Sequence, residues 1–167
     1  MGLMKAAALC PQAILLPVDF DEYRRYSRLF KAAVAEIAPV IEDRGIDEIY
    51  LDLTDVPGAQ ADGGIAVAQA IKRNVTGTTG LTCSIGLAPN KLLAKICSDL
   101  EKPDGLTRVT FDDLPARIWP LPAKRVNGIG PKAAAKLGAN GIQTIGELAA
   151  ADPAWLVMHF GNAYGHW

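Results

Sequence analysis

The sequence predicts an α+β fold, in which a mixed β-sheet with helices on one face is followed by a small all-α unit. Strand-like and helix-like periodicities alternate up to residue 110. From Phe111 onward the strand signals vanish, and short helical stretches are broken by proline and glycine. The chain has 167 residues, half of them hydrophobic, which allows one ordinary domain with a small satellite.

The first elements are a short helix, a strand and a long helix. Residues 2–9 form a helical stretch, and the apolar run Ala13–Val18 predicts a strand. Asp19 precedes Glu22 by three residues, as in a capping box. Apolar side chains then recur at helical spacing until Pro39, which predicts an amphipathic helix.

A hairpin, a helix and a further strand follow. The hairpin consists of Val40–Arg44, a turn at Gly45 and Asp47–Thr54, whose second strand alternates apolar and polar residues. The segment Ile65–Val75 has helical spacing, whereas Leu81–Leu87 alternates as a strand does.

The next helix is expected from the N-cap residue Asn90 to Lys102, where a Pro-Asp-Gly turn ends it. A short strand, Leu106–Thr110, completes the first part. We place the boundary to the all-α unit within residues 112–122, so that residues 1–115 and 116–167 form the two domains.

The distribution of charge along the chain limits the classes of function that the protein can have. Residues 116–167 carry five basic and two acidic side chains, a balance of +3, and the first 115 residues carry −4. This asymmetry suggests cation binding in the first part and phosphate binding in the second.

No apolar run is long enough to span a membrane or to act as a secretory leader, so we expect a cytoplasmic protein of bacterial type. The three scattered cysteines suggest neither a disulfide framework nor a zinc site.

Two adjacent carboxylates, Asp47 and Glu48, begin an apolar strand just after a turn. Neighbouring strand residues point to opposite faces, so both reach one cation only if the backbone twists there. A divalent cation would relieve the cost of burying them. The alternative is a solvated hairpin turn with Asp47 exposed.

Lys102 lies where the predicted helix meets the Pro-Asp-Gly turn, with nothing apolar beside it in the sequence. Its ammonium can therefore reach a phosphate. A solvated helix end, with the lysine complementing the helix dipole, is the equally weighted alternative.

The segment from Asn127 to Lys132 has the form of a helix-hairpin-helix motif. Gly128 and Gly130 permit a tight turn whose backbone N–H groups point outward, and Pro131 suits a first helical turn. Such a turn binds a DNA phosphate without reading bases. An ordinary glycine turn between helices is the alternative.

Taken together, these segments resemble Y-family translesion DNA polymerases of the DNA polymerase IV type. The resemblance rests on Leu9-Cys10-Pro11, on Asp19–Tyr23 with Ser27, and on the Gly-Ile-Asp-Glu-Ile-Tyr-Leu-Asp strand. It extends through the Ser-Ile-Gly to Asn-Lys-Leu-Leu-Ala-Lys helix, Lys-Pro-Asp-Gly and Asn-Gly-Ile-Gly. The resemblance covers essentially the whole chain and implies a partial ferredoxin-like palm followed by a thumb.

The resemblance also implies roles for particular residues. Asp47 and Glu48 would be the palm carboxylates that hold two catalytic Mg²⁺ ions, and Lys102 would contact the incoming deoxynucleoside triphosphate. Asn127, Gly128, Gly130 and Lys132 would grip primer-template DNA. Asp52 is expected to be structural.

The sequence departs from the family at both ends. The family's further metal-binding aspartate and its fingers would precede Met1, and its little finger and sliding-clamp peptide would follow Trp167. We reject Asp19-Phe20-Asp21 as the missing aspartate motif, because Asp19 has a helix-capping role. We therefore expect a palm remnant with a thumb that binds Mg²⁺ weakly and is inactive alone, and whose open sheet edge invites homodimerisation.

Three rival interpretations remain. A non-enzymatic helix-hairpin-helix module would bind DNA and use the acidic pair as scaffold. A nucleotidyl cyclase would share the acidic turn but would leave the phosphate-gripping segment unexplained. A helix-hairpin-helix glycosylase or nuclease would need a further catalytic Asp or Lys after the hairpin, and none stands out.

Overall fold

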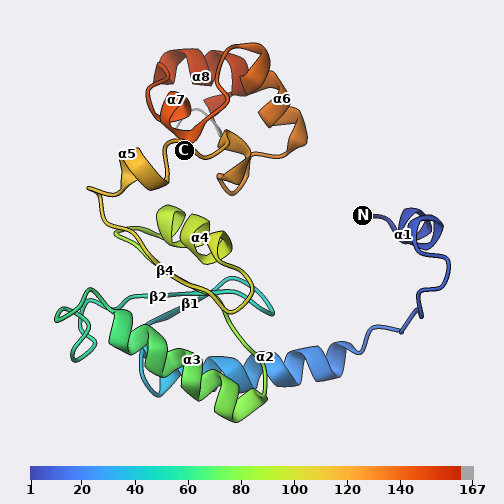
Figure 1. Ribbon diagram of the computed structural model, residues 1–167, viewed down its shortest axis with the longest axis vertical. Helices are drawn as coiled ribbons and strands as arrows, with labels where there is room; N and C mark the ends of the chain where they lie inside the picture. Colours follow the sequence, from blue (N-terminus) through green and yellow to red (C-terminus); the bar gives the residue numbers. More distant parts are fainter. Residues whose placement is uncertain (163–167) are drawn as a thin grey trace.

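The computed structural model describes residues 1–162, which form an N-terminal arm, a mixed α/β body and a C-terminal helical unit (Figure 1). The arm comprises α1 (Leu3–Leu9), none of whose residues is buried, and an extended segment up to Asp19. The predicted strand Ala13–Val18 is wrong as a paired strand. The run is extended (Figure 1), but within residues 1–162 no neighbouring strand supplies the hydrogen bonds that a ladder requires.

The long helix α2 (Phe20–Ala35) confirms the predicted amphipathic helix. The Asp19 side chain caps it by accepting hydrogen bonds from the backbone N–H groups of Asp21, at 3.1 Å, and Glu22, at 3.0 Å. The reciprocal half of the predicted capping box is missing, because the Glu22 carboxylate accepts hydrogen bonds from Arg25 instead. Helix α3 (Ile65–Thr79) lies alongside α2.

Four short strands form two separate sheets instead of the single mixed sheet that we predicted. β1 (Ile41–Asp43) pairs antiparallel with β2 (Ile49–Leu51), and β3 (Ile85–Leu87) pairs parallel with β4 (Leu106–Arg108). No ladder joins β2 to β3 within the described residues.

The paired strands are shorter than expected. The clearest case is the predicted strand Leu81–Leu87, of which only the last three residues pair. Its first part is held by side chains of α3. The Thr76 hydroxyl donates to the Leu81 carbonyl at 3.0 Å, and the Lys72 ammonium donates to the Cys83 carbonyl at 2.6 Å.

Helices cover both faces of the strand layer, not one face as predicted. Buried side chains of α2 and α3, among them Val34 and Ile71, form a core cluster on which Ile49 and Ile85 pack. Helix α4 (Lys91–Leu100) lies against the opposite face, where Gly86 meets its backbone (Figure 1). The sequence places a helix here correctly, because the Asn90 side chain accepts the cap bond from the Leu93 N–H at 2.9 Å.

The C-terminal unit is all-α, as predicted. It contains η1 (Ala123–Arg125), α6 (Pro131–Ala139), α7 (Ile145–Ala149) and α8 (Pro153–Phe160), and α5 (Leu114–Arg117) leads into it. A second core cluster joins this unit to α4 and the residue after β4. Its buried members are Leu93, Ile96, Cys97, Val109, Ile118, Val126 and Ile145.

The cysteines Cys10, Cys83 and Cys97 are all free thiols. In the described part of the chain, no helix has both the length and the apolar character needed to cross a bilayer.

Candidate functional site

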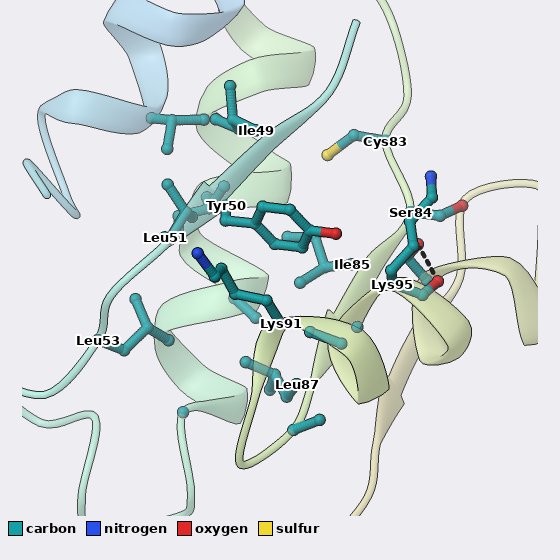
Figure 2. Close-up of a pocket in the computed structure, with 18 of the residues that line it drawn as sticks. Ile49, Tyr50, Leu51, Leu53, Cys83, Ser84, Ile85, Leu87, Lys91 and Lys95 are labelled. Atoms are coloured by element: carbon teal, nitrogen blue, oxygen red, sulfur yellow. Dashed lines mark hydrogen bonds between the residues drawn. The ribbon is translucent and has the colours of Figure 1, made fainter. Parts of the chain in front are cut away.

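A cavity of about 1350 Å³ lies between the two sheets and brings together three of the seven predicted site residues, Asp47, Glu48 and Lys102. Figure 2 shows β2, which carries Ile49 and Leu51, facing β3, which carries Ile85 and Leu87, across this space. Asp47, Glu48, Lys95 and Lys102 also line the cavity. An acidic turn and three lysines, Lys91 among them, therefore share one cavity with an apolar floor.

Lys31 stabilises the acidic turn. Its ammonium donates to the Asp43 carboxylate and to the Gly45 carbonyl, each at 2.7 Å. The Asp43 carboxylate also accepts a hydrogen bond from the Gly45 N–H at 2.9 Å. Both members of the Lys31–Asp43 ion pair therefore bond to the backbone of the turn. The hydrogen bond from Lys31 holds the pKa of Asp43 below its ordinary value.

Asp47 and Glu48 differ in their surroundings. Asp47 is exposed, whereas Glu48 is half-buried and its carboxylate lies 2.6 Å from the Lys95 ammonium. Burial of Lys95 works against its charge, but the hydrogen bond from Lys95 and the negative charge of Glu48 outweigh it, so the pKa of Lys95 is raised. Lys95 thus remains a cation and holds Glu48 as its counter-ion.

Lys102 lies on the rim of the cavity. Its ammonium is 2.5 Å from the Asp99 carboxylate one helical turn earlier, and its side chain is 55% exposed. The turn after it is fixed by Lys72, which forms an ion pair with Asp104, and by the Gly105 N–H, which donates to the Ser84 hydroxyl at 3.1 Å. The turn that follows Lys102 is therefore anchored by hydrogen bonds, and the Lys102 side chain is exposed with its ammonium paired to Asp99.

The carboxylates fit only part of a magnesium site. Mg²⁺ requires near-octahedral oxygen coordination, and the pair Asp47 and Glu48 offers two groups, one of them bound to Lys95. Within residues 1–162, no three metal-binding side chains gather in one place. The donors have the right chemistry, but they do not make a complete site by themselves.

The glycine turn of the C-terminal unit is open to solvent. Asn127, Gly128, Gly130 and Lys132 are all exposed, whereas Ile129 packs against the second core cluster. Gly128 adopts a φ of 95°, which favours glycine. A Cβ added at Gly130 would meet nothing within 4 Å, so a ligand could approach the backbone there.

The backbone N–H groups of this turn differ in whether a local carbonyl accepts their hydrogen bond. The N–H groups of Ile129 and Gly130 donate to local carbonyls at 3.1 Å. The first bond of α6 runs from the Ala134 N–H to the Gly130 carbonyl at 2.9 Å, so the preceding N–H groups of the helix have no intrahelical acceptor. Lys132 carries one of these groups beside its ammonium. The arrangement suits a phosphate oxygen.

Sequence reasoning missed two lysines. Lys95 stands 47 residues from Glu48, and Lys72 stands 32 residues from Asp104, so neither pair leaves a local pattern. The only available signal was the helical spacing of Lys91 and Lys95, which places both on one side of α4. Lys91 also reaches the hairpin, with its ammonium 2.7 Å from the Glu42 carboxylate. The Asp52 carboxylate also lines the cavity and accepts two hydrogen bonds from Thr54.

Comparison with known proteins identifies the family. Residues 1–99, more than half of the chain, match the model of the impB/mucB/samB family. The chain belongs to the impB/mucB/samB family. Its sequence is 43% identical over 163 residues to DNA polymerase IV of Methanoculleus marisnigri, an alignment that covers 98% of this chain and 45% of that protein.

Solved structures of the same family have the same fold. DinB from Sulfolobus solfataricus matches 98% of this chain and 48% of its own with a TM-score of 0.89 and 30% identity. An insertion ternary complex of Dbh DNA polymerase covers 99% of this chain and 48% of its own, with a TM-score of 0.87 and 31% identity. The chain is thus a homologue of Y-family DNA polymerases, and it spans less than half of the length of these relatives.

Proposed function

We propose that this chain is part of a Y-family translesion DNA polymerase, an enzyme that adds nucleotides to a primer 3′-end during damage bypass. The observation that carries the proposal is the cavity in which Asp47, Glu48, Lys95 and Lys102 meet. The similarity to DNA polymerase IV supports it. Magnesium would supply two-metal phosphoryl transfer in the intact enzyme, with Asp47 and Glu48 as two of its ligands.

Lys102 is proposed to contact the incoming deoxynucleoside triphosphate. Its ammonium projects from a turn that Lys72 and Ser84 fix in place, so little ordering is needed when a phosphate arrives. Its ion pair with Asp99 is exposed and exchangeable.

Residues 1–115 are proposed to be part of a palm, and residues 116–167 a thumb that holds primer-template DNA. Asn127, Gly128, Gly130 and Lys132 would contact the sugar-phosphate backbone, because their turn exposes backbone N–H groups beside a cation. The sliding clamp is proposed as a partner of a full-length protein only. A homodimer through the open sheet edge is proposed for this chain.

We further propose that the chain alone does not extend a primer. Glu48 is bound to Lys95, and two carboxylates leave most of the octahedral positions of Mg²⁺ unfilled. Incubation of the chain with primer-template DNA, Mg²⁺ and all four nucleotides is expected to give no product. Clear incorporation that Asp47→Ala removes would contradict this proposal.

A non-enzymatic DNA-binding module is the second candidate, because Glu48 and Lys95 already neutralise each other as scaffold charges would. Both candidates predict duplex binding that weakens with salt, since phosphate contacts release counter-ions. The double variant Asp47→Ala/Glu48→Ala separates them. Unchanged binding without any magnesium-dependent contribution favours the module, whereas a magnesium-dependent gain in affinity for primer-template with nucleotide, lost in this variant, favours the polymerase.

A further inference from the structure

We propose that Lys72 is a positioning residue for phosphate binding, which acts through the Pro-Asp-Gly turn to hold Lys102 in place. This inference rests on the phosphate contact proposed above for Lys102 and deepens it. The residues concerned come from α3, from the segment before β3 and from the turn after α4.

The Lys72 ammonium joins two segments that are distant in sequence. It donates hydrogen bonds to the Cys83 carbonyl at 2.6 Å and to the Asp104 carbonyl at 2.7 Å, and it forms an ion pair with the Asp104 carboxylate. An ammonium group has three hydrogens, and these three acceptors match them. The Lys72 side chain is only 18% exposed, so it is largely enclosed. Lys72 therefore ties the turn to the segment before β3.

The backbone conformation of Asp104 explains why the turn needs this partner. Within residues 1–162, Asp104 is the one residue other than glycine with a positive φ, at 55°. L-residues rarely adopt this left-handed conformation, because it brings Cβ close to the following carbonyl oxygen. Lys72 binds both the carbonyl and the carboxylate of Asp104 and thereby stabilises the conformation. Lys72 thus fixes the path of the chain two residues after Lys102.

Further contacts hold the turn on both sides of Lys102. The Gly105 N–H donates to the Ser84 hydroxyl at 3.1 Å, and the Gly105 carbonyl accepts from the Ile85 N–H at 3.0 Å. A Cβ at Gly105 would lie 2.5 Å from the Glu101 carbonyl oxygen, so the turn also packs closely on the end of α4. The backbone of Lys102 therefore lies in a short segment with a fixed point at each end.

Lys72 lies outside the cavity that Lys102 lines. Lys102, Pro103 and Asp104 line the cavity, as does Ile71, the neighbour of Lys72 on α3, but Lys72 does not. Helices α3 and α4 lie on opposite faces of the strand layer (Figure 1). An effect of Lys72 on a phosphate in the cavity must therefore pass through the turn, or through the charge of Asp104.

Ordering the turn in advance lowers the cost of binding a phosphate. When the turn is already fixed, only the end of the Lys102 side chain has to be ordered as the phosphate arrives. Loss of Lys72 would remove a donor from the Cys83 and Asp104 carbonyls and would free the turn. The ordering cost of one long side chain corresponds to a loss of affinity of about two- to tenfold.

NMR titration of the chain with inorganic triphosphate, without divalent cation, tests the proposal. Lys72→Met is expected to weaken triphosphate binding by about two- to tenfold. Lys72→Arg, which supplies the charge and at least as many donors, should recover most of the wild-type affinity. Arg73→Met is the matched control, because it removes the same charge from an exposed neighbouring position on α3. Equal affinities for Lys72→Met and Arg73→Met overturn the proposal.

A double-mutant cycle with Lys102→Ala separates positioning from a general effect of charge. Lys102→Ala alone is expected to weaken triphosphate binding by about tenfold, the effect of one hydrogen bond to a charged group. If Lys72 positions Lys102, Lys72→Met causes no further loss in the Lys102→Ala background. An unpaired Asp104 carboxylate would repel triphosphate in both backgrounds, so equal losses in the two overturn the proposal.

The same cycle distinguishes failure of this inference from failure of the proposed function. If Lys102→Ala binds triphosphate as wild type does, the phosphate contact of Lys102 is wrong and the positioning role fails with it. If Lys102→Ala weakens binding but Lys72→Met does not, only the positioning role is overturned.

Backbone NMR relaxation of the wild type gives a measurement that does not depend on how a variant folds. The amides of Lys102, Asp104 and Gly105 are expected to have order parameters of about 0.85, as rigid backbone does, before triphosphate is added. Order parameters below about 0.6 would overturn the proposal, because a mobile turn cannot hold Lys102 in position.

Discussion

Gly86 is the point of closest approach between β3 and α4. A Cβ at this position would lie 2.0 Å from the Ala94 carbonyl oxygen and 2.5 Å from the Ser98 backbone nitrogen. These are backbone atoms of a helix, which cannot move aside as a flexible side chain can. The absence of a side chain at Gly86 is therefore what allows α4 to lie on the strand and to bring Lys95 to Glu48.

Gly86→Ala is expected to destabilise the protein by about 1–3 kcal/mol or more, because the new methyl group must push the two elements apart. Gly77→Ala is the control, since a Cβ at Gly77 in α3 meets nothing within 4 Å. It should be neutral or should stabilise by up to about 1 kcal/mol. Urea unfolding measures both, and similar free energies of unfolding for the two variants would contradict this account of the contact.

The ion pair of Lys95 with Glu48 makes a pH prediction. The pKa of Lys95 is raised in the folded state, so its stabilising contribution is present below the pKa of the unfolded chain, about 10.4, and is lost as pH rises through the folded pKa. Wild type and Lys95→Met are therefore expected to differ in free energy of unfolding at pH 7, to begin to converge near about pH 10.4, and to converge fully only as pH rises through the higher folded pKa of Lys95. A difference that grows with alkaline pH would have the wrong sign.

At the scale of elements, the helices and the β1–β2 hairpin follow from local sequence, whereas the parallel pairing of β3 with β4 does not. Asp19 and Asn90 begin α2 and α4 as predicted, because a cap bonds to amides two or three residues away. The two separate sheets could not be predicted, since strand pairing depends on neighbours distant in sequence. The position of α4 on the opposite face was missed for the same reason.

The Asn90 cap gives a test at this scale. Asn90→Ala is expected to cost about 1 kcal/mol of stability, because the Leu93 N–H loses its acceptor at the start of α4. Asn127→Ala, at an exposed position of the glycine turn, is expected to leave the free energy of unfolding within about 0.5 kcal/mol of wild type. If thermal or urea unfolding shows the same loss for both, the cap is not the cause.

The candidate site shows the same division between local and distant information. The acidic turn, the lysine before the Pro-Asp-Gly turn and the glycine turn are each visible within a few residues of sequence. Their neighbours are not, because the ion pairs of Lys95 with Glu48 and of Lys72 with Asp104 join distant segments. Sequence therefore predicts which residues to examine, but not that Glu48 already has a cationic partner.

At the scale of the whole molecule, two core clusters connect the acidic cavity to the glycine turn. The first lies beneath the strands, and the second joins α4 to the C-terminal unit through Ile118 and Val126. Because α4 carries both Lys95 and part of the second cluster, the cavity and the C-terminal unit share one element. A duplex bound at the glycine turn, as proposed, would thus be attached to a body that also carries Asp47 and Glu48.

Duplex binding by the whole chain should depend on Lys132. Lys132→Ala is expected to weaken binding of any duplex sequence and to lower the slope of log K against log salt by about 1. Lys5→Ala, which removes an equal charge from α1 in the N-terminal arm, is expected to leave the slope unchanged. Fluorescence anisotropy at several salt concentrations measures both, and equal slopes for Lys132→Ala and wild type would contradict a phosphate contact at this turn.

The most direct test of the central claim is primer extension by a chimera, in which this chain replaces the matching segment of the Methanoculleus marisnigri DNA polymerase IV. The account predicts that the folded chimera extends a primer with Mg²⁺ and that Asp47→Ala or Glu48→Ala abolishes extension. Asp21→Asn, a change of a carboxylate of α2 that is 92% exposed and pairs with Arg24, should leave extension intact. A folded chimera that does not extend, or one that extends equally well without the carboxylates of Asp47 and Glu48, would contradict the claim.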